Sequence, residues 1–108
     1  GRGGPYERFF FCLVNKVWEN QRFFKSPDHL RHEVLIRLGY CTTYRRKDGS
    51  SHAEADSMKW NKMEKAEAEK IMSDAIKFIC DEIIPGMEPT ALRGEIEEMV
   101  GMGNYECR

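Results

Sequence analysis

The sequence predicts an all-α domain of three to four helices, with a long basic loop between the second and third helices. Apolar residues recur at helical spacing in several stretches, and helix-start and helix-stop residues flank these stretches. A chain of 108 residues with 41% hydrophobic and 32% charged residues suits one globular domain with one core. We expect residues 6–100 to form this single helical domain. Residues 1–5 would be a flexible segment or a cloning remnant, and residues 101–108 a flexible tail.

A first helix is expected over residues 6–24. Phe10, Val14 and Val17 recur at i, i+4 and i+7, which places them on one helical face. Three consecutive phenylalanines could also begin a strand, but the length of the apolar stretch favours a helix.

The second helix is expected over residues 27–38, and the sequence marks both of its ends. Ser26 can cap the exposed amides, and Pro27 suits the first helical position. Gly39 can adopt the left-handed conformation that ends a helix.

The helical pattern breaks over residues 40–57, and this is where we expect the long basic loop. Residues 40–44 have strand-like composition, and Asp48-Gly49 is a turn signal. However, residues 50–56 offer no apolar alternation for a returning strand. The prediction is therefore a loop with at most one short strand.

Two further helices are expected over residues 58–84 and 90–100. Asn61 followed by Glu64 is a variant of the capping box, and apolar residues then recur at helical spacing. We expect Trp60 to close the core at the start of the longer helix.

Charge is distributed unevenly along the chain. Residues 1–47 hold ten Lys and Arg against four Asp and Glu, a formal charge of +6, whereas residues 48–108 carry −7. The basic half can attract phosphate or an acidic protein surface, or it can be neutralised by the acidic half. The sequence leaves these alternatives open.

The first functional hypothesis is a non-enzymatic module that binds nucleic acid through its basic half. Lys and Arg supply phosphate contacts, and exposed aromatic side chains can stack on bases. The expected contacts to nucleic acid, or to an acidic protein surface, are Lys16, Arg22, Lys25, Arg31, Arg45, Arg46, Lys47, Phe10 and Tyr44.

The alternative hypothesis is an adaptor domain that binds a partner helix or peptide on an apolar surface. Leu92, Ile96 and Met99 of the last predicted helix would form that surface. No apolar run is long enough to cross a membrane, so we expect no membrane partner.

Neither a catalytic site nor a metal or other cofactor is expected. His29, His32, Cys41 and His52 are metal-ligating residue types, but they form no paired-cysteine motif, and surface histidines are the favoured interpretation. No glycine-rich phosphate-binding loop is present.

The four cysteines show no paired spacing. Free thiols in a reducing compartment are favoured over a disulfide framework, and we expect an intracellular protein, nuclear or cytoplasmic. The residues concerned are Cys12, Cys41, Cys80 and Cys107.

The chain also resembles the HMG-box family of DNA-bending domains over residues 5–84. Its opening, Pro-Tyr-Glu-Arg-Phe-Phe-Phe-Cys, is similar to the start of such a box, and Trp60 with Met63 resembles the Trp-x-x-Leu before the third helix. The resemblance implies that Phe10 occupies the position of the intercalating wedge, with a core that contains Phe9, Phe11 and Trp60. A box of this kind could equally be a scaffold that binds protein or RNA.

Overall fold

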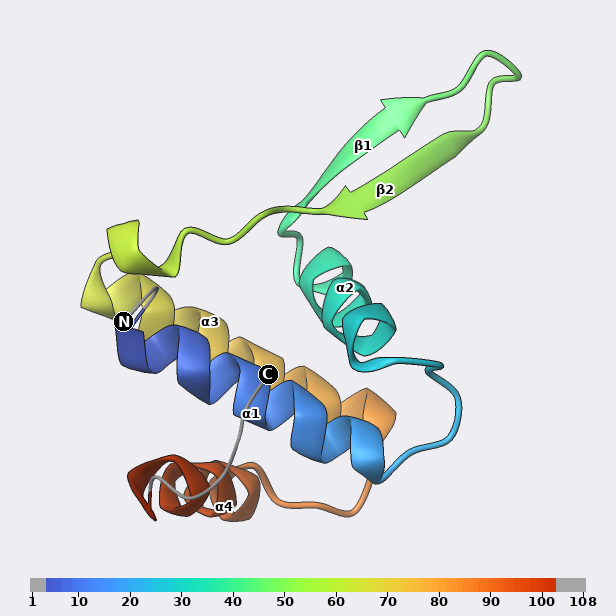
Figure 1. Ribbon diagram of the computed structural model, residues 1–108. Helices are drawn as coiled ribbons and strands as arrows, with labels where there is room; N and C mark the ends of the chain where they lie inside the picture. The colour runs from blue at the N-terminus through green and yellow to red at the C-terminus, as the bar shows by residue number, and fades with distance from the viewer. Residues whose placement is uncertain (1–3, 103–108) are drawn as a thin grey trace.

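The computed structural model describes residues 4–102, which form four α-helices and a two-stranded antiparallel sheet (Figure 1). The prediction of an all-α domain is wrong, because a β-hairpin replaces the expected loop between the second and third helices. In chain order the elements are α1 (Gly4–Glu19), α2 (Pro27–Arg37), β1 (Cys41–Arg45), β2 (Ser51–Ala55), the 3₁₀ turn η1 (Trp60–Lys62), α3 (Lys65–Phe78), the π-helical turn η2 (Ile79–Ile83) and α4 (Pro89–Met102).

The core lies between the four helices. Phe10, Leu13 and Val14 of α1 are buried, and Ile71 and Met72 of α3 are buried with them. α2 and α4 each contact both α1 and α3, and Figure 1 shows α2 and α4 on opposite sides of α1.

Trp60 closes one end of the core, as expected. Its side chain is buried, and its ring lies 5.2 Å from that of Phe10 between centroids. Burial of these two large rings removes considerable apolar surface from water.

α1 ends earlier than predicted, at Glu19 instead of residue 24. Hydrogen bonds in the following turn explain this: Gln21 Nε2 donates to the Trp18 carbonyl (3.0 Å), and Phe24 N donates to Gln21 Oε1 (2.7 Å). Trp18 Nε1 also donates to the Phe24 carbonyl (2.9 Å). These bonds satisfy backbone groups that a continued helix would have used.

The predicted ends of α2 are confirmed. Ser26 Oγ accepts a hydrogen bond from His29 N (3.1 Å), and Pro27 occupies the first turn. At the other end Gly39 has a φ of +93°, and Tyr40 N donates to the Leu35 carbonyl (2.8 Å). This left-handed turn redirects the chain into β1.

The hairpin pairs Cys41 with Ala55 at its base and Arg45 with Ser51 near its tip. Arg46 N donates to the Ser50 carbonyl (2.8 Å), and Gly49, with a φ of +92°, closes the turn. Most of the ribbon faces solvent, so β2 needs no large apolar side chain. Its sequence therefore lacks the alternation of apolar and polar residues that marks a strand with one buried face.

The predicted helix 58–84 is divided in the structure. The chain first makes η1, and α3 begins only after Glu64, which has no side-chain capping bond, so the predicted capping box is wrong. Beyond α3 the helix widens into η2, where Ile84 N donates to the Ile79 carbonyl (2.9 Å). Ile79 and Cys80, although consecutive, are both buried there.

The terminal expectations fall partly outside the described residues. Gly4 and Pro5 already belong to α1, and Gly101 and Met102 continue α4. The remainder of the segments 1–5 and 101–108 is not described.

α4 packs against the core, and this covers most of the surface that was expected to bind a partner helix. Leu92 and Ile96 are buried, and Met99 packs against the core from its edge. A partner helix could reach these side chains only if α4 left α1 and α3.

We therefore predict that Ile96→Ala destabilises the fold. Ile96 is fully buried, and loss of its methylene groups should lower the free energy of unfolding by about 2–5 kcal/mol. Urea denaturation followed by circular dichroism measures this change. The control, Glu98→Ala on the exposed face of α4, should change it by less than about 0.5 kcal/mol. Equal effects of the two substitutions would contradict the packing of α4.

Candidate nucleic-acid interface

The hairpin projects from the helical body (Figure 1). Its base joins the end of α2, and beyond this base the residues 42–51 are exposed. The longest dimension of the molecule is 50 Å, against 32 and 22 Å in the other directions. The loop that was predicted to be basic is thus an ordered arm.

Four sequence-predicted site residues lie together at the end of this arm, and we call them the basic tip: Tyr44, Arg45, Arg46 and Lys47. The Tyr44 side chain is 53% exposed. Within residues 4–102 none of the three cations forms an ion pair with a carboxylate, and Arg46 Nη1 instead lies 3.4 Å from Ser50 Oγ. The positive charges of the tip therefore face solvent.

The turn beyond these residues is held by one carboxylate. Asp48 Oδ1 accepts hydrogen bonds from Ser50 Oγ (2.7 Å) and Ser50 N (2.9 Å). These bonds lower the pKa of Asp48 below its ordinary value of 3.8, and the bond from the Ser50 hydroxyl has the larger effect. Asp48 thus orders the turn that carries the basic tip, and it offsets part of the tip's positive charge.

A second group of expected site residues lies around the connection between α1 and α2. Arg22 and Lys25 border one shallow cleft there, while Lys16 borders a neighbouring cleft with Asn20. Phe23, whose side chain is 75% exposed, lies in the same connection. The structure therefore divides the expected basic surface into two separate groups.

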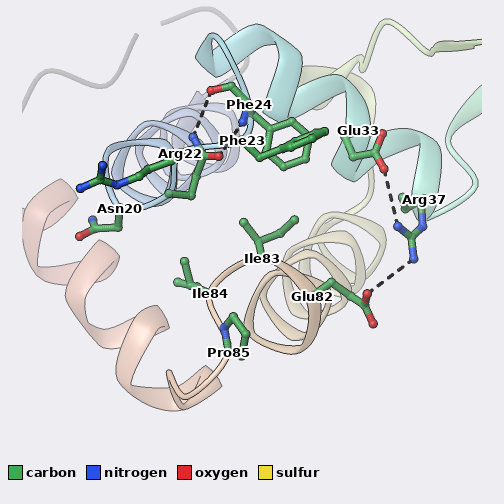
Figure 2. A pocket seen from close by; sticks show the side chains of 11 residues that line it. Asn20, Arg22, Phe23, Phe24, Glu33, Arg37, Glu82, Ile83, Ile84 and Pro85 are labelled. Atoms are coloured by element: carbon green, nitrogen blue, oxygen red, sulfur yellow. Dashed lines mark hydrogen bonds and ion pairs between the residues drawn. The ribbon is translucent and has the colours of Figure 1, made fainter.

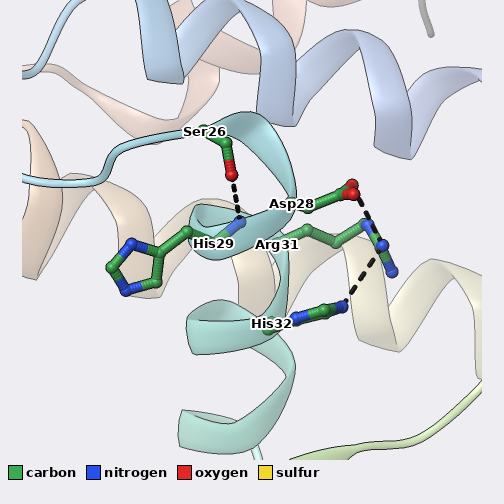
Figure 3. A network of polar contacts seen from close by, with 5 residues as sticks. All are labelled: Ser26, Asp28, His29, Arg31 and His32. Carbon is green, nitrogen blue, oxygen red and sulfur yellow. Dashed lines mark hydrogen bonds and ion pairs between the residues drawn. The ribbon is translucent and has the colours of Figure 1, made fainter.

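Arg31 belongs to neither group (Figure 3). Its Nη2 lies 3.1 Å from Asp28 Oδ1 and 3.3 Å from His32 Nε2, and its guanidinium lies over the Phe11 ring, 5.5 Å from the centroid. With 23% of its side chain exposed, Arg31 is engaged by local contacts and is poorly placed to reach phosphate.

Phe10 cannot contact bases in this structure. Only 1% of its surface is exposed, because it packs against Trp60 inside the core. An intercalating wedge at this position would require Phe10 to leave the core, which would return a large apolar surface to water. The burial of Phe10 therefore does not favour the expected contact with bases.

The ion pairs of the described region show how far the two halves of the chain neutralise each other. Arg37, whose Nη2 lies 3.9 Å from Glu82 Oε1, is the one cation of residues 1–47 that pairs with the acidic half within this region. Two lysines of α3 pair instead with carboxylates four residues further along, Lys70 with Asp74 of the same helix and Lys77 with Asp81 of η2. Neutralisation of the whole basic half is thus not observed.

A cleft of about 600 Å³ lies between the α1–α2 connection, α2 and η2 (Figure 2). On one side Arg37 bridges Glu33 (3.6 Å) and Glu82 (3.9 Å). On the other side lie Arg22 and Phe23. The charged groups that line the cleft balance, so it offers no strong attraction for phosphate. Sequence reasoning missed it because its residues come from three distant segments.

The residues considered for zinc have separate partners. His29 Nδ1 accepts from Lys25 N (3.4 Å), His52 lies 3.2 Å from Glu54, and Cys41 Sγ points to the Ile36 carbonyl. Within residues 4–102, no three His, Cys, Asp or Glu side chains are grouped so that they could hold a metal ion.

The cysteines differ from one another. Cys41 and Cys80 are free thiols, and burial raises the pKa of the Cys80 thiol. Cys12 is disulfide-bonded, which corrects the expectation of a free thiol there. Cys107 lies outside the described residues.

Comparisons of the chain with protein-family models, with curated proteins and with solved structures give no match. In the described part of the chain, every helix is too short or too polar to cross a membrane. The function therefore has to be inferred from the surface of the chain itself.

The Asp48 contacts predict that the hairpin turn loosens in acid. Since the pKa of Asp48 in the folded state lies below 3.8, its contribution to the turn is complete above pH 3.8 and is lost as the pH falls through the lowered pKa. NMR chemical shifts of the Ser50 amide, followed from neutral to acidic pH, should show this transition. Asp48→Asn, which has no titrating carboxylate, should not show it. A transition that persists in Asp48→Asn would contradict the assignment.

Proposed function

We propose that the chain is a non-enzymatic nucleic-acid-binding module and that the basic tip contacts backbone phosphates. One observation carries the proposal: Arg45, Arg46 and Lys47 stand on an ordered arm away from the helical body, with no ion-pair partner among the described residues. Adjacent, solvated cations of this kind attract a polyanion without first breaking internal ion pairs.

The shape of the arm supports this proposal. A two-stranded antiparallel ribbon is narrow enough to enter the major groove of duplex DNA, which is about 12 Å wide. The hydrogen bonds of Asp48 and the left-handed Gly49 order the turn before binding, so less conformational entropy is lost in the complex.

Tyr44 adds a second kind of contact. It is the exposed aromatic residue of the arm, and it lies next to the cations in sequence. An exposed ring beside phosphate-binding cations suits stacking on an unpaired base. The same phosphate chemistry occurs in DNA and RNA, so both are included in the tests. An acidic protein surface is the outcome to expect if neither of them binds.

Removal of the three cations should weaken the salt dependence of binding. We expect the slope of log K against log [salt] for a short DNA duplex to lose about 2–3 in magnitude when Arg45, Arg46 and Lys47 are replaced by Ala. Fluorescence anisotropy with labelled DNA duplex, RNA duplex and single strands, at several salt concentrations, measures the slope.

The matched control for this variant replaces Lys59, Lys62 and Lys65 by Ala. These lysines are also exposed and carry the same total charge, but they precede and begin α3 instead of lying on the arm. The control should retain nearly the full slope. Equal losses in the two triple variants, or no binding of any probe at low salt, would contradict the proposal.

Tyr44→Ala should preferentially weaken binding to single strands. Stacking contributes about 1–3 kcal/mol per base, so the affinity for a single strand should fall roughly 5- to 150-fold. The affinity for duplex DNA should change much less. Tyr44→Phe retains the ring and should bind like the unchanged chain. A similar loss in Tyr44→Phe and Tyr44→Ala would show that the ring does not stack.

A further inference from the structure

The outer edge of β1 presents backbone groups that pair with nothing in the described structure. Arg46 N donates to the Ser50 carbonyl, and Asp56 N donates to the Tyr40 carbonyl. Hydrogen-bonded pairs alternate with other pairs along antiparallel strands, so Thr42 and Tyr44 bond to β2. The N–H and C=O groups of Cys41, Thr43 and Arg45 therefore point away from β2.

Side chains leave this edge unprotected. Over the segment Cys-Thr-Thr-Tyr, β1 carries no charge and no proline, and its residues are β-branched or aromatic or small. Residues 42–45 are all exposed. Proteins usually protect such an edge with charges, proline, a bulge or a covering helix, because an open edge pairs readily with another strand.

The edge of β2 is better protected. β2 lies close to α2, and the Glu54 carboxylate and the His52 imidazole lie in the middle of the strand. Their interaction, at 3.2 Å between Nε2 and Oε2, is exposed to solvent. β1 is thus the edge that is open for pairing.

We propose that two copies of this chain associate through β1. The two strands run antiparallel about a two-fold axis at Thr43, and the two hairpins form one four-stranded sheet. This dimer is a state of the chain free of nucleic acid, and the inference does not depend on nucleic-acid binding.

The β1 sequence is complementary to itself in this register. Thr43 faces Thr43 of the second copy, and Cys41 faces Arg45, so that about six backbone hydrogen bonds form between residues whose groups point outward. Thr42 faces Tyr44, in the closer type of pair, where an aromatic ring covers a β-branched neighbour.

Charge favours the antiparallel arrangement. About the two-fold axis, the arginines and lysine of each basic tip lie at opposite ends of the four-stranded sheet. In a parallel arrangement, Arg45 would lie beside Arg45 of the second copy, and like charges side by side are destabilising. The two-fold arrangement is also the commonest symmetry of soluble homo-oligomers.

Proline substitutions test each edge separately. Thr43→Pro removes the outward N–H of β1 while it leaves the bonds between β1 and β2 intact, because Thr43 is in a non-bonded pair. Ala53→Pro, across the hairpin from Thr43, does the same at the outer edge of β2. Sedimentation velocity, with no nucleic acid present, should show a dimer for the unchanged chain and for Ala53→Pro at high protein concentration. Thr43→Pro should remain a monomer.

Cross-linking provides a measurement that does not depend on how the proline variants fold. Thr43→Cys places a thiol on the two-fold axis, where facing Cα atoms of a bonded pair are about 5.5 Å apart and a disulfide can form. Mild oxidation of Thr43→Cys should give a dimer that is cross-linked through the two introduced thiols, which peptide mass spectrometry identifies. Oxidation of Ala53→Cys should give no dimer that is cross-linked through its introduced thiols. A monomeric unchanged chain, a dimer that persists in Thr43→Pro, or equal cross-linking of both cysteine variants would overturn the proposal.

Discussion

The position of the hairpin depends on the turn at Gly39, and the exposure of the basic tip depends on the hairpin. Gly39 adopts a left-handed φ of +93°, a conformation that residues with a Cβ rarely adopt. Tyr40 N then donates to the Leu35 carbonyl of α2 (2.8 Å). The Tyr40 carbonyl in turn accepts from Asp56 N (2.9 Å). Hydrogen bonds at Tyr40 thus connect the last turn of α2 to both strands at the base of the hairpin, and the arm leaves the helical body at this point.

This arrangement separates two kinds of charge. On the helical body, several cations meet carboxylates one helical turn away, as Lys70 and Asp74 do, and such exposed pairs leave little net field. On the arm, the cations of the basic tip lack ion-pair partners among the described residues. A chain with a formal charge of only −1 can therefore still present a concentrated positive end.

The sequence predicts what local rules determine and misses what tertiary contacts determine. Ser26, Pro27 and Gly39 mark the ends of α2 correctly, because caps and left-handed turns act within a few residues. β2 is missed because Ser-His-Ala-Glu-Ala has no apolar face, although the turn signal at Asp48-Gly49 is present. The sequence predicts the residues of the basic tip as a group because its cations are adjacent in the chain. By contrast, the burial of Phe10, Leu92 and Ile96 depends on which helices pack together, and apolar spacing cannot distinguish a core face from a partner-binding face.

We propose that nucleic acid binds at the basic tip. Titration of the ¹⁵N-labelled chain with a short DNA duplex at low salt, followed by NMR, tests this claim most directly because every backbone amide reports separately. We predict shift changes concentrated over residues 43–50, with α4 and the core of α1 unaffected. Changes centred on the cleft beside Phe23, or no changes at all with either DNA or RNA, would contradict the account.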